Sequence, residues 1–136
     1  RLIEATLNSL KHAYAPYSDF LVACGLITTQ NNIITGNNQE NAAYPSGLCA
    51  ERTAFFHYGS HFRSEIIESC CILAKKRHSD SLNTISPCGA CRQVMLEYET
   101  IQEKPIKILL VDEVYITEIP SISTLLPFNF TKKNLE

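Results

Sequence analysis

The chain is organised around two short stretches, Cys49-Ala50-Glu51-Arg52 and Pro87-Cys88-Gly89-Ala90-Cys91-Arg92. A CxxC pair with a further cysteine well upstream suits a tetrahedral zinc ion, because thiolate sulfur matches the softness and the geometry that zinc prefers. Structural zinc sites fill all four positions with cysteine or histidine, whereas catalytic sites hold three protein ligands and leave one position open. Cys49, Cys88 and Cys91 supply three ligands, so the pattern favours an enzyme over a structural zinc clip.

Glu51, two residues after Cys49, is the candidate proton carrier. A carboxylate beside the open position can take a proton from water and pass it to a leaving group. Side chains two apart do not share a lateral face of a helix. Those of a first turn can still surround a point just ahead of the helix, because each Cα–Cβ bond tilts toward the N-terminus. Helices that begin near Cys49 and Pro87 would direct two positive N-terminal ends at the sulfurs, which favours thiolates.

The composition is that of an ordinary globular protein. With 136 residues, of which 45% are hydrophobic and 19% charged, the chain suits a single domain over residues 1–136. A net charge of −2 argues against a nucleic-acid partner, which normally requires a basic excess. No apolar stretch approaches the roughly 20 residues that cross a bilayer, and no signal peptide is recognisable, so we expect a cytoplasmic protein with no membrane association.

The remaining cysteines and the histidines are assigned no chemistry. A redox role for the CxxC pair is an alternative to zinc, but it leaves Cys49 and Glu51 unexplained. The other cysteines lie in apolar runs and are predicted to be buried as small hydrophobic side chains: Cys24, Cys70 and Cys71. The histidines match no ligand spacing and are predicted to lie at the surface: His12, His57, His61 and His78.

Helical and strand patterns alternate along the chain. They predict helices over residues 2–14, 49–58 (with Gly59 as its stop) and 89–98, and strands over residues 20–29, 33–36, 66–74, 106–111 and 114–117. Lys75-Lys76-Arg77 is predicted to be a solvated loop after a strand. The alternation implies crossover connections and some parallel pairing. We therefore predict an α/β fold, a three-layer α/β/α sandwich with a mixed sheet of about five strands.

Five motifs together resemble those of the small homotetrameric cytidine deaminases. They occur in the family's order and cover nearly the whole chain: Tyr17-Ser18-Asp19-Phe20, Gly36-Asn37-Asn38-Gln39-Glu40-Asn41-Ala42, Cys49-Ala50-Glu51-Arg52-Thr53-Ala54, Ser86-Pro87-Cys88-Gly89-Ala90-Cys91-Arg92-Gln93, and Leu125-Leu126-Pro127 with Phe130. A ligand two residues before a glutamate, followed by PCxxC, is the signature of zinc deaminases. The Cys49-Ala50-Glu51 part or the PCxxC part alone would be only modest evidence for this family. Both parts together with the motif that contains Asn38 and Glu40 are specific for it.

The resemblance implies hydrolytic deamination of cytidine and deoxycytidine to uridine and deoxyuridine, with release of ammonia, as a step of pyrimidine salvage. It implies one Zn²⁺ per chain, held by Cys49, Cys88 and Cys91, with Glu51 as the catalytic proton carrier. Three thiolates on Zn²⁺ leave a net negative charge that weakens it as a Lewis acid. Arg52 matches the family position that hydrogen-bonds the zinc cysteines and offsets that charge.

The substrate-binding residues are also implied by the resemblance. Asn38 and Glu40 match the ribose-binding pair, and two residues apart on a strand they would point to the same side. Phe20 matches the aromatic that packs on the base, and the backbone of Ala50 matches the donor to the base carbonyl. Two further aromatics match positions that complete the pocket of a neighbouring subunit in a homotetramer: Tyr44 and Phe130.

Each of these assignments has a simpler alternative. Asn38 and Glu40 can be polar residues at the edge of a hairpin, and the aromatics can belong to the core or to an interface. Glu51 can serve only the helix dipole, and Arg92 can be a solvated charge. For the whole chain, the alternatives are a deaminase of another aminated nucleoside and a catalytically inactive zinc-binding module. An intact Glu51 beside an open metal position argues against the inactive module.

Overall fold

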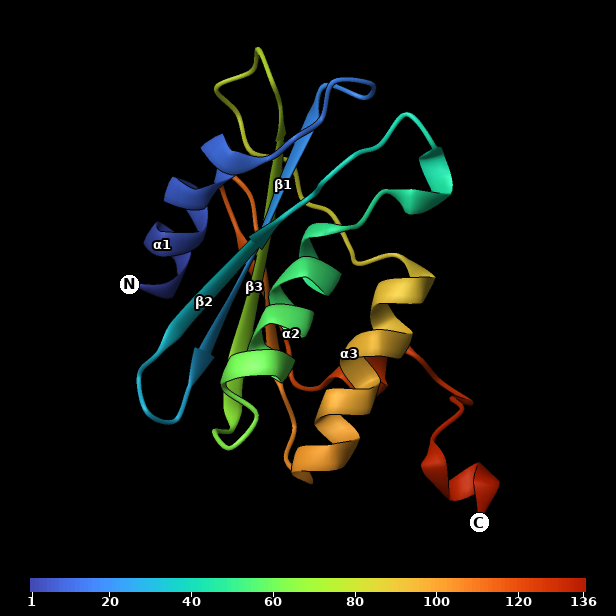
Figure 1. Cartoon of the computed structure of the whole chain (residues 1–136). Helices are drawn as coiled ribbons and strands as arrows, with labels where there is room; N and C mark the ends of the chain where they lie inside the picture. Colours follow the sequence, from blue (N-terminus) through green and yellow to red (C-terminus); the bar gives the residue numbers. More distant parts are fainter.

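The computed structural model describes residues 1–136 and contains one five-stranded sheet in the order β2-β1-β3-β4-β5 (Figure 1). Only β3 and β4 are parallel; the other neighbours are antiparallel. A parallel pair needs a crossover connection, and helix α3 supplies it. The predicted mixed sheet is thereby confirmed, and its strands are β1 (Phe20–Thr28), β2 (Ile33–Asn37), β3 (Ile67–Lys76), β4 (Lys107–Val111) and β5 (Ile116–Ile119).

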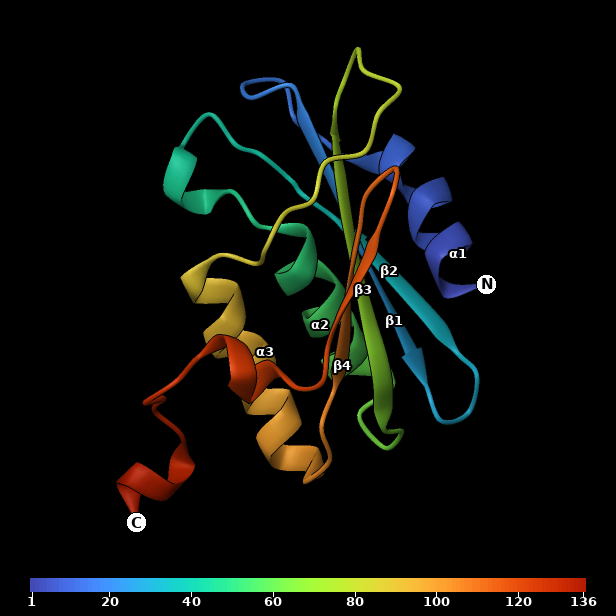
Figure 2. The ribbon, with the colours of Figure 1, turned by 180° about the vertical axis from the view of Figure 1, so that it is seen from behind.

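Helices cover both faces of the sheet, as a three-layer α/β/α sandwich requires. Helix α1 (Leu2–Ser9) lies on one face, and α2 (Ala50–His61) and α3 (Gly89–Gln102) lie on the other (Figures 1 and 2). The larger hydrophobic cluster fills the space between the sheet and the α2–α3 pair, and the smaller one lies beneath α1. None of the helices combines the length and hydrophobicity that crossing a bilayer requires.

The central strands are buried on both faces because each face contacts helices. Along β1, Val22 and Cys24 belong to the larger cluster, whereas Leu21 and Ala23 belong to the smaller one, as the two-residue period of a strand dictates. The prediction of buried cysteines is confirmed, since Cys24, Cys70 and Cys71 are each 0% exposed. All four histidines are exposed, which confirms that prediction too.

Two element boundaries were predicted wrongly. Helix α2 continues through Gly59 to His61, and the glycine allows Tyr98 of α3 to approach closely, since a Cβ there would lie 2.5 Å from the Tyr98 hydroxyl. The last strand begins at Ile116 rather than Val114. Asp112 Oδ1 accepts hydrogen bonds from the backbone N–H groups of Val114 and Tyr115, both at 2.7 Å, and these bonds turn the chain first.

Three smaller corrections concern the remaining elements. The first helix is α-helical only to Ser9 and ends as a 3₁₀ turn over Leu10–His12. Helix α3 extends to Gln102, beyond the predicted residue 98. The basic run is not a solvated loop, because its two lysines are the last residues of β3 and Arg77 forms an ion pair with Asp19.

Gly36 on β2 allows the first turns of α2 to approach the sheet closely. A Cβ at this position would lie 2.4 Å from the backbone N of Ala54 and 2.7 Å from the carbonyl O of Ala50. These are backbone atoms, so neither can move aside as a flexible side chain would. The absence of a side chain at Gly36 therefore helps to set where the N-terminal end of α2 lies.

We expect Gly36→Ala to lower the free energy of unfolding by about 3 kcal/mol, the upper part of the range for overpacking. Urea denaturation would measure the change. Gly89→Ala is the matched control, because a Cβ there has nothing within 4 Å. An unchanged stability of Gly36→Ala would contradict the close packing of β2 against α2.

Candidate active site

Three cysteines meet at the N-terminal ends of α2 and α3. Cys49 is the N-cap residue of α2, Cys88 is the N-cap residue of α3, and Cys91 lies in the first turn of α3. Figure 1 shows the two helices side by side with their N-terminal ends at the same end of the pair. The three Sγ atoms lie within 4.8 Å of one another, with 3.9 Å between Cys49 and Cys88 and 3.4 Å between Cys88 and Cys91.

This donor set fits a zinc ion. Sulfurs bound to tetrahedral zinc at about 2.3 Å lie roughly 3.8 Å apart, close to the separations between these Sγ atoms. Cys91 is buried, Cys49 is half-buried and Cys88 is exposed, so the group is reached from one side. Three sulfur ligands on one side leave a fourth tetrahedral position for a small molecule.

The surroundings of Cys49 favour its thiolate. Hydrogen bonding with Cys91, together with that from Arg52 and Cys88, lowers the pKa of the Cys49 thiol to about 5 although burial opposes ionisation. Arg52 Nη2 donates to Cys49 Sγ at 3.4 Å. The Arg52 Nε atom is buried and has no hydrogen-bond partner in the protein. The same hydrogen bond to Cys49, with burial, raises the pKa of Cys91.

Glu51 lies in the first turn of α2 and is only 4% exposed. Burial raises its pKa above the usual value for glutamate, and the negative charge of Cys49 adds to the effect. A carboxylate whose pKa is raised toward neutrality both accepts and returns protons readily near pH 7. The position and the environment of Glu51 therefore suit general acid–base chemistry.

A pocket of about 620 Å³, here called the site pocket, opens in front of the cysteines. Its volume is within the range of small-molecule sites. Eight of the residues singled out in the sequence line it: Asn38, Glu40, Tyr44, Cys49, Ala50, Glu51, Arg52 and Cys88. These eight residues, which are spread between positions 38 and 88 of the sequence, thus meet in one cavity that combines metal ligands, a buried carboxylate and polar groups.

Comparison with known proteins agrees with this geometry. A sequence model described as the cytidine and deoxycytidylate deaminase zinc-binding region matches residues 1–106. A cytidine deaminase of Halalkalibacterium halodurans is 37% identical over 134 residues, which are 98% of this chain and 95% of that protein. A cytidine deaminase of Sporosarcina psychrophila is 36% identical, over 99% of this chain and 93% of that protein. The chain belongs to the cytidine deaminase family.

Solved structures of cytidine deaminases share the fold. The crystal structure from Burkholderia pseudomallei matches with a TM-score of 0.79 and 34% identity, over 95% of this chain and 96% of that one. The structure from Mycobacterium tuberculosis matches with a TM-score of 0.74 and 27% identity, over 96% of this chain and 94% of that one. As a member of this family, the chain is a hydrolase that acts on C–N bonds and has zinc as its cofactor, and the three cysteines form the group that can hold the ion.

Two aromatics expected in the deaminase pocket lie outside its lining. Phe20 packs against the larger core cluster, and Val22, two residues further on the same face of β1, lines the pocket instead. Phe130 is 57% exposed, and its carbonyl O accepts a hydrogen bond from Gln93 Nε2 at 2.9 Å. The roles of Phe20 on the base and of Phe130 toward a neighbouring subunit stay predictions.

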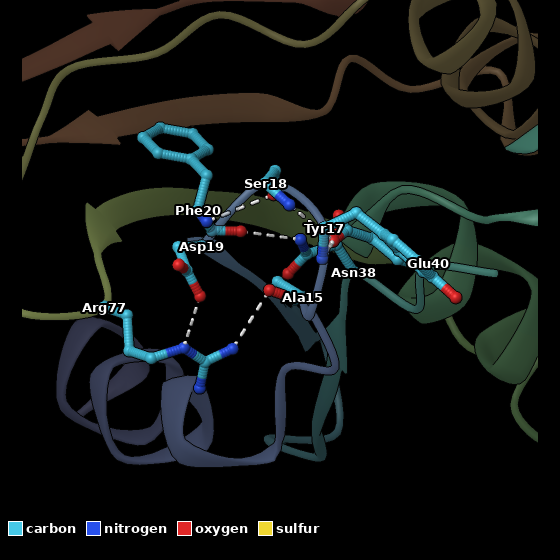
Figure 3. A network of polar contacts seen from close by, with 8 residues as sticks. All are labelled: Ala15, Tyr17, Ser18, Asp19, Phe20, Asn38, Glu40 and Arg77. Atoms are coloured by element: carbon cyan, nitrogen blue, oxygen red, sulfur yellow. Dashed lines mark hydrogen bonds and ion pairs between the residues drawn. The ribbon is translucent and has the colours of Figure 1, made fainter. Parts of the chain in front are cut away.

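Asn38 and Glu40 line the pocket, but they follow β2, which ends at Asn37, rather than lying on it. Asn38 uses both ends of its amide on β1: Oδ1 accepts from Val22 N at 2.9 Å, and Nδ2 donates to Phe20 O at 2.8 Å. Glu40 Oε1 accepts from the backbone N–H groups of the turn before β1 (Figure 3). Asn38 therefore also joins the pocket wall to the sheet, and Glu40 joins it to the turn before β1.

Sequence reasoning missed the role of Arg92, for which a solvated charge was the alternative. Its Nε donates to Pro87 O at 2.8 Å and its Nη1 to Leu125 O at 2.9 Å. These bonds attach the loop before Cys88 to the C-terminal segment. Nine further lining residues were assigned no role from the sequence: Tyr17, Ser18, Val22, Gln39, Asn41, Gly47, Leu48, Ile85 and Ser86. Five of them belong to the deaminase-like motifs, and the other four, Val22, Gly47, Leu48 and Ile85, do not.

Proposed function

We propose that residues 1–136 form a single domain that deaminates cytidine and deoxycytidine by hydrolysis, releasing ammonia with uridine or deoxyuridine. The observation that carries this proposal is the site pocket, in which the buried Glu51 lies beside the zinc cysteines and opposite polar groups suited to a sugar. The names of the relatives, all cytidine deaminases, support cytidine as the substrate. Pyrimidine salvage and a cytoplasmic location belong to the same proposal.

The chemistry divides between the metal and the chain. Bound zinc supplies a Lewis acid that brings the pKa of water to about 7 in well-known zinc enzymes. Glu51 would accept one proton from water as the oxygen adds to C4 of the base, and would deliver it to the ring nitrogen N3, where it stays. It would then move the second proton, from the oxygen now bonded to C4, to the amine, which leaves as ammonia when the C4–N bond breaks. Burial, which raises the pKa of Glu51, makes each return of the proton easier. Arg52 withdraws negative charge from the Cys49 sulfur through its hydrogen bond.

Polar groups of the pocket orient the nucleoside. Ala50 is the first residue of α2, so its backbone N–H has no acceptor within the helix and is available to the carbonyl of the base. Glu40 keeps one carboxylate oxygen for a sugar hydroxyl, because Oε1 alone accepts the two backbone N–H groups. Asn38 holds the strand beside it and completes this side of the pocket.

An ultraviolet assay of cytidine loss, run beside a zinc determination on the purified protein, tests the proposal. We expect turnover with about one zinc per chain, the stoichiometry of a single three-ligand site. Zinc without turnover of cytidine or deoxycytidine would reject these substrates. Turnover of another aminated nucleoside would then favour a related deaminase, and no turnover of any would favour the inactive zinc-binding module.

A homotetramer with shared pockets is part of the proposal. Tyr44 lines the site pocket while 75% exposed, and Phe130 is 57% exposed, which is unusual for large aromatic side chains. Contiguous exposed apolar surface commonly marks an interface between chains. The exposure of Tyr44 and Phe130 therefore supports the proposal that a neighbouring copy of the chain completes the pocket.

Replacing Phe130 by alanine is expected to weaken assembly and to raise KM for cytidine by about tenfold, a loss typical of an aromatic interface residue. Analytical ultracentrifugation would follow the assembly, and steady-state kinetics would give KM. Leu7→Ala on α1 serves as the control, since Leu7 is also exposed but lies on the opposite face of the sheet. A fully active monomer would refute the shared pocket.

A further inference from the structure

A short turn before β1 forms one wall of the site pocket. Tyr17 and Ser18 in this turn line the pocket, and their backbone N–H groups donate to Glu40 Oε1 at 3.0 and 3.1 Å (Figure 3). Partial burial opposes ionisation of Glu40, but these hydrogen bonds outweigh it and hold the pKa of Glu40 below its usual value. The turn therefore fixes one oxygen of the Glu40 carboxylate, and a change in the turn would move the carboxylate.

Arg77, the first residue after β3, binds the same turn from its other side. Its Nε donates to Asp19 Oδ1 at 2.8 Å and its Nη2 to Ala15 O at 3.0 Å (Figure 3). The backbone N–H of Arg77 donates to Asp19 O at 2.8 Å. The guanidinium thus joins the two ends of the turn, Ala15 and Asp19, as a planar group with several donors can.

Asp19 has a backbone conformation that needs such support. Its φ is 54°, in the left-handed region that few residues other than glycine, asparagine and aspartate adopt. The Asp19 N–H donates to Ala15 O at 3.1 Å, which closes the turn on itself. Arg77 therefore contacts both residues of the hydrogen bond that shapes the turn.

We propose that Arg77 is a positioning residue for sugar recognition: it holds the Ala15–Asp19 turn so that Tyr17 and Ser18 keep the Glu40 carboxylate in place at the site pocket. This inference rests on the proposed nucleoside function. Arg77 itself does not line the pocket, so it acts through the turn and not on the substrate.

The alternative role of Arg77 is a simple surface ion pair. The Arg77 and Asp19 side chains are 38% and 61% exposed, and exposed pairs contribute little to folding stability. We therefore expect Arg77→Ala to change Tm by no more than about 2 °C. A kinetic effect at nearly constant Tm would separate positioning from a structural role.

The test compares two substrates that differ only in the sugar hydroxyls. For Arg77→Ala, we expect KM for cytidine to rise about tenfold with kcat within about twofold, which is the loss of roughly one charged hydrogen bond. The proposal places a hydroxyl of the sugar ring, at the 2′ or 3′ position, on Glu40. For 2′,3′-dideoxycytidine, which lacks both of these and keeps only the 5′-hydroxyl, we expect kcat/KM to change less than about twofold. Lys76→Ala is the charge-matched control, because its exposed side chain has no hydrogen bond or ion pair, and it should behave like the unaltered protein.

Two further variants sharpen the result. Arg77→Lys keeps the charge but lacks the fork, so it should restore only part of the affinity for cytidine. Asp19→Asn keeps a residue that tolerates positive φ and removes the ion pair, so it should produce part of the loss. Equal losses of kcat/KM on both substrates, or no loss on either, would overturn the proposal.

Amide hydrogen exchange gives a measurement that does not depend on turnover. In Arg77→Ala, the amides of Tyr17 and Ser18 should exchange at least about tenfold faster, because the turn that presents them to Glu40 is released. Unchanged protection would overturn the positioning role. A failure of the proposed function would look different: the unaltered protein would then fail to turn over cytidine, while the exchange result would still decide the role of Arg77.

Discussion

Replacement of Glu51 by glutamine is expected to lower kcat/KM for cytidine by at least about 10³-fold, within the range that general acid–base groups contribute. Glutamine keeps the size of the side chain and its capacity to hydrogen-bond, but it cannot accept a proton near neutral pH. Glu51 is buried and lines the pocket, so its carboxylate can reach a substrate bound there. The ultraviolet assay of cytidine loss would measure the fall.

The same variant should keep its zinc and its fold. The three sulfur ligands are untouched, so about one zinc per chain is expected. Burial raises the pKa of Glu51, which means that the folded protein favours the neutral form of this side chain over the charged form. Glutamine resembles the neutral form, so Tm should not fall. Loss of zinc or of stability would therefore assign Glu51 a structural role.

Glu97→Gln is the matched control for this experiment. Glu97 is an exposed carboxylate on α3 outside the site pocket, and the substitution removes the same charge. It should leave kcat/KM within about twofold, as exposed surface changes usually do. If Glu51→Gln also stayed within tenfold of the unaltered protein, another group would have to carry the proton.

The centre of the site could be predicted because its geometry is local. Sequence patterns predicted helices that begin near Cys49 and Pro87, and Cys49 and Cys88 are the N-cap residues of these helices in the structure. Side chains at the start of a helix have few possible directions. Because Cys49 lies two residues before Glu51, the sequence alone indicates that both side chains face the space ahead of the helix. The meeting of the two helix ends, by contrast, depends on the whole sheet, and it was expected only because the three cysteines were assigned to one zinc ion.

The contacts that shape the pocket wall could not be predicted in the same way. Arg77 reaches Ala15 across 62 positions of the sequence, and Arg92 reaches Leu125 across 33. Neither side chain lies in a periodic pattern that would mark it as buried or paired. A charged side chain just after a strand, as in Arg77, or in the first turns of a helix, as in Arg92, is most often solvated, so its partner becomes evident only when the chain is folded.

Packing also overrode local signals within helices and strands. Gly59 is a reasonable helix stop by its preference, yet α2 continues to His61, and the glycine instead leaves the space that the Tyr98 side chain occupies. Val114 and Tyr115 have strong strand preference, yet the side chain of Asp112 binds their N–H groups and holds them in a turn. Such side-chain bonds to the backbone compete with regular structure at its ends.

Cys88→Ser is expected to lower the zinc content from about one to less than about 0.1 per chain after dialysis, because a serine hydroxyl is a poor ligand for zinc beside two thiolates. Turnover of cytidine should fall with the zinc. Cys88 is exposed, so the substitution itself should cost little folding energy. A lower Tm would then reflect the loss of a ligand that binds the folded protein. Metal analysis by atomic spectroscopy beside the activity assay would measure both quantities.

Cys71→Ser is the control that shows whether the loss of zinc is specific to cysteines of the metal site. Cys71 is fully buried in the smaller core cluster, where burial raises the pKa of its thiol to about 12, so it is not a thiolate ligand. Its replacement by serine should cost more stability than that of Cys88 but leave the zinc content unchanged. Zinc retained in Cys88→Ser would remove Cys88 from the metal site. Zinc lost equally from both variants would mean that the metal responds to the fold as a whole, and the three-cysteine group would no longer explain where it binds.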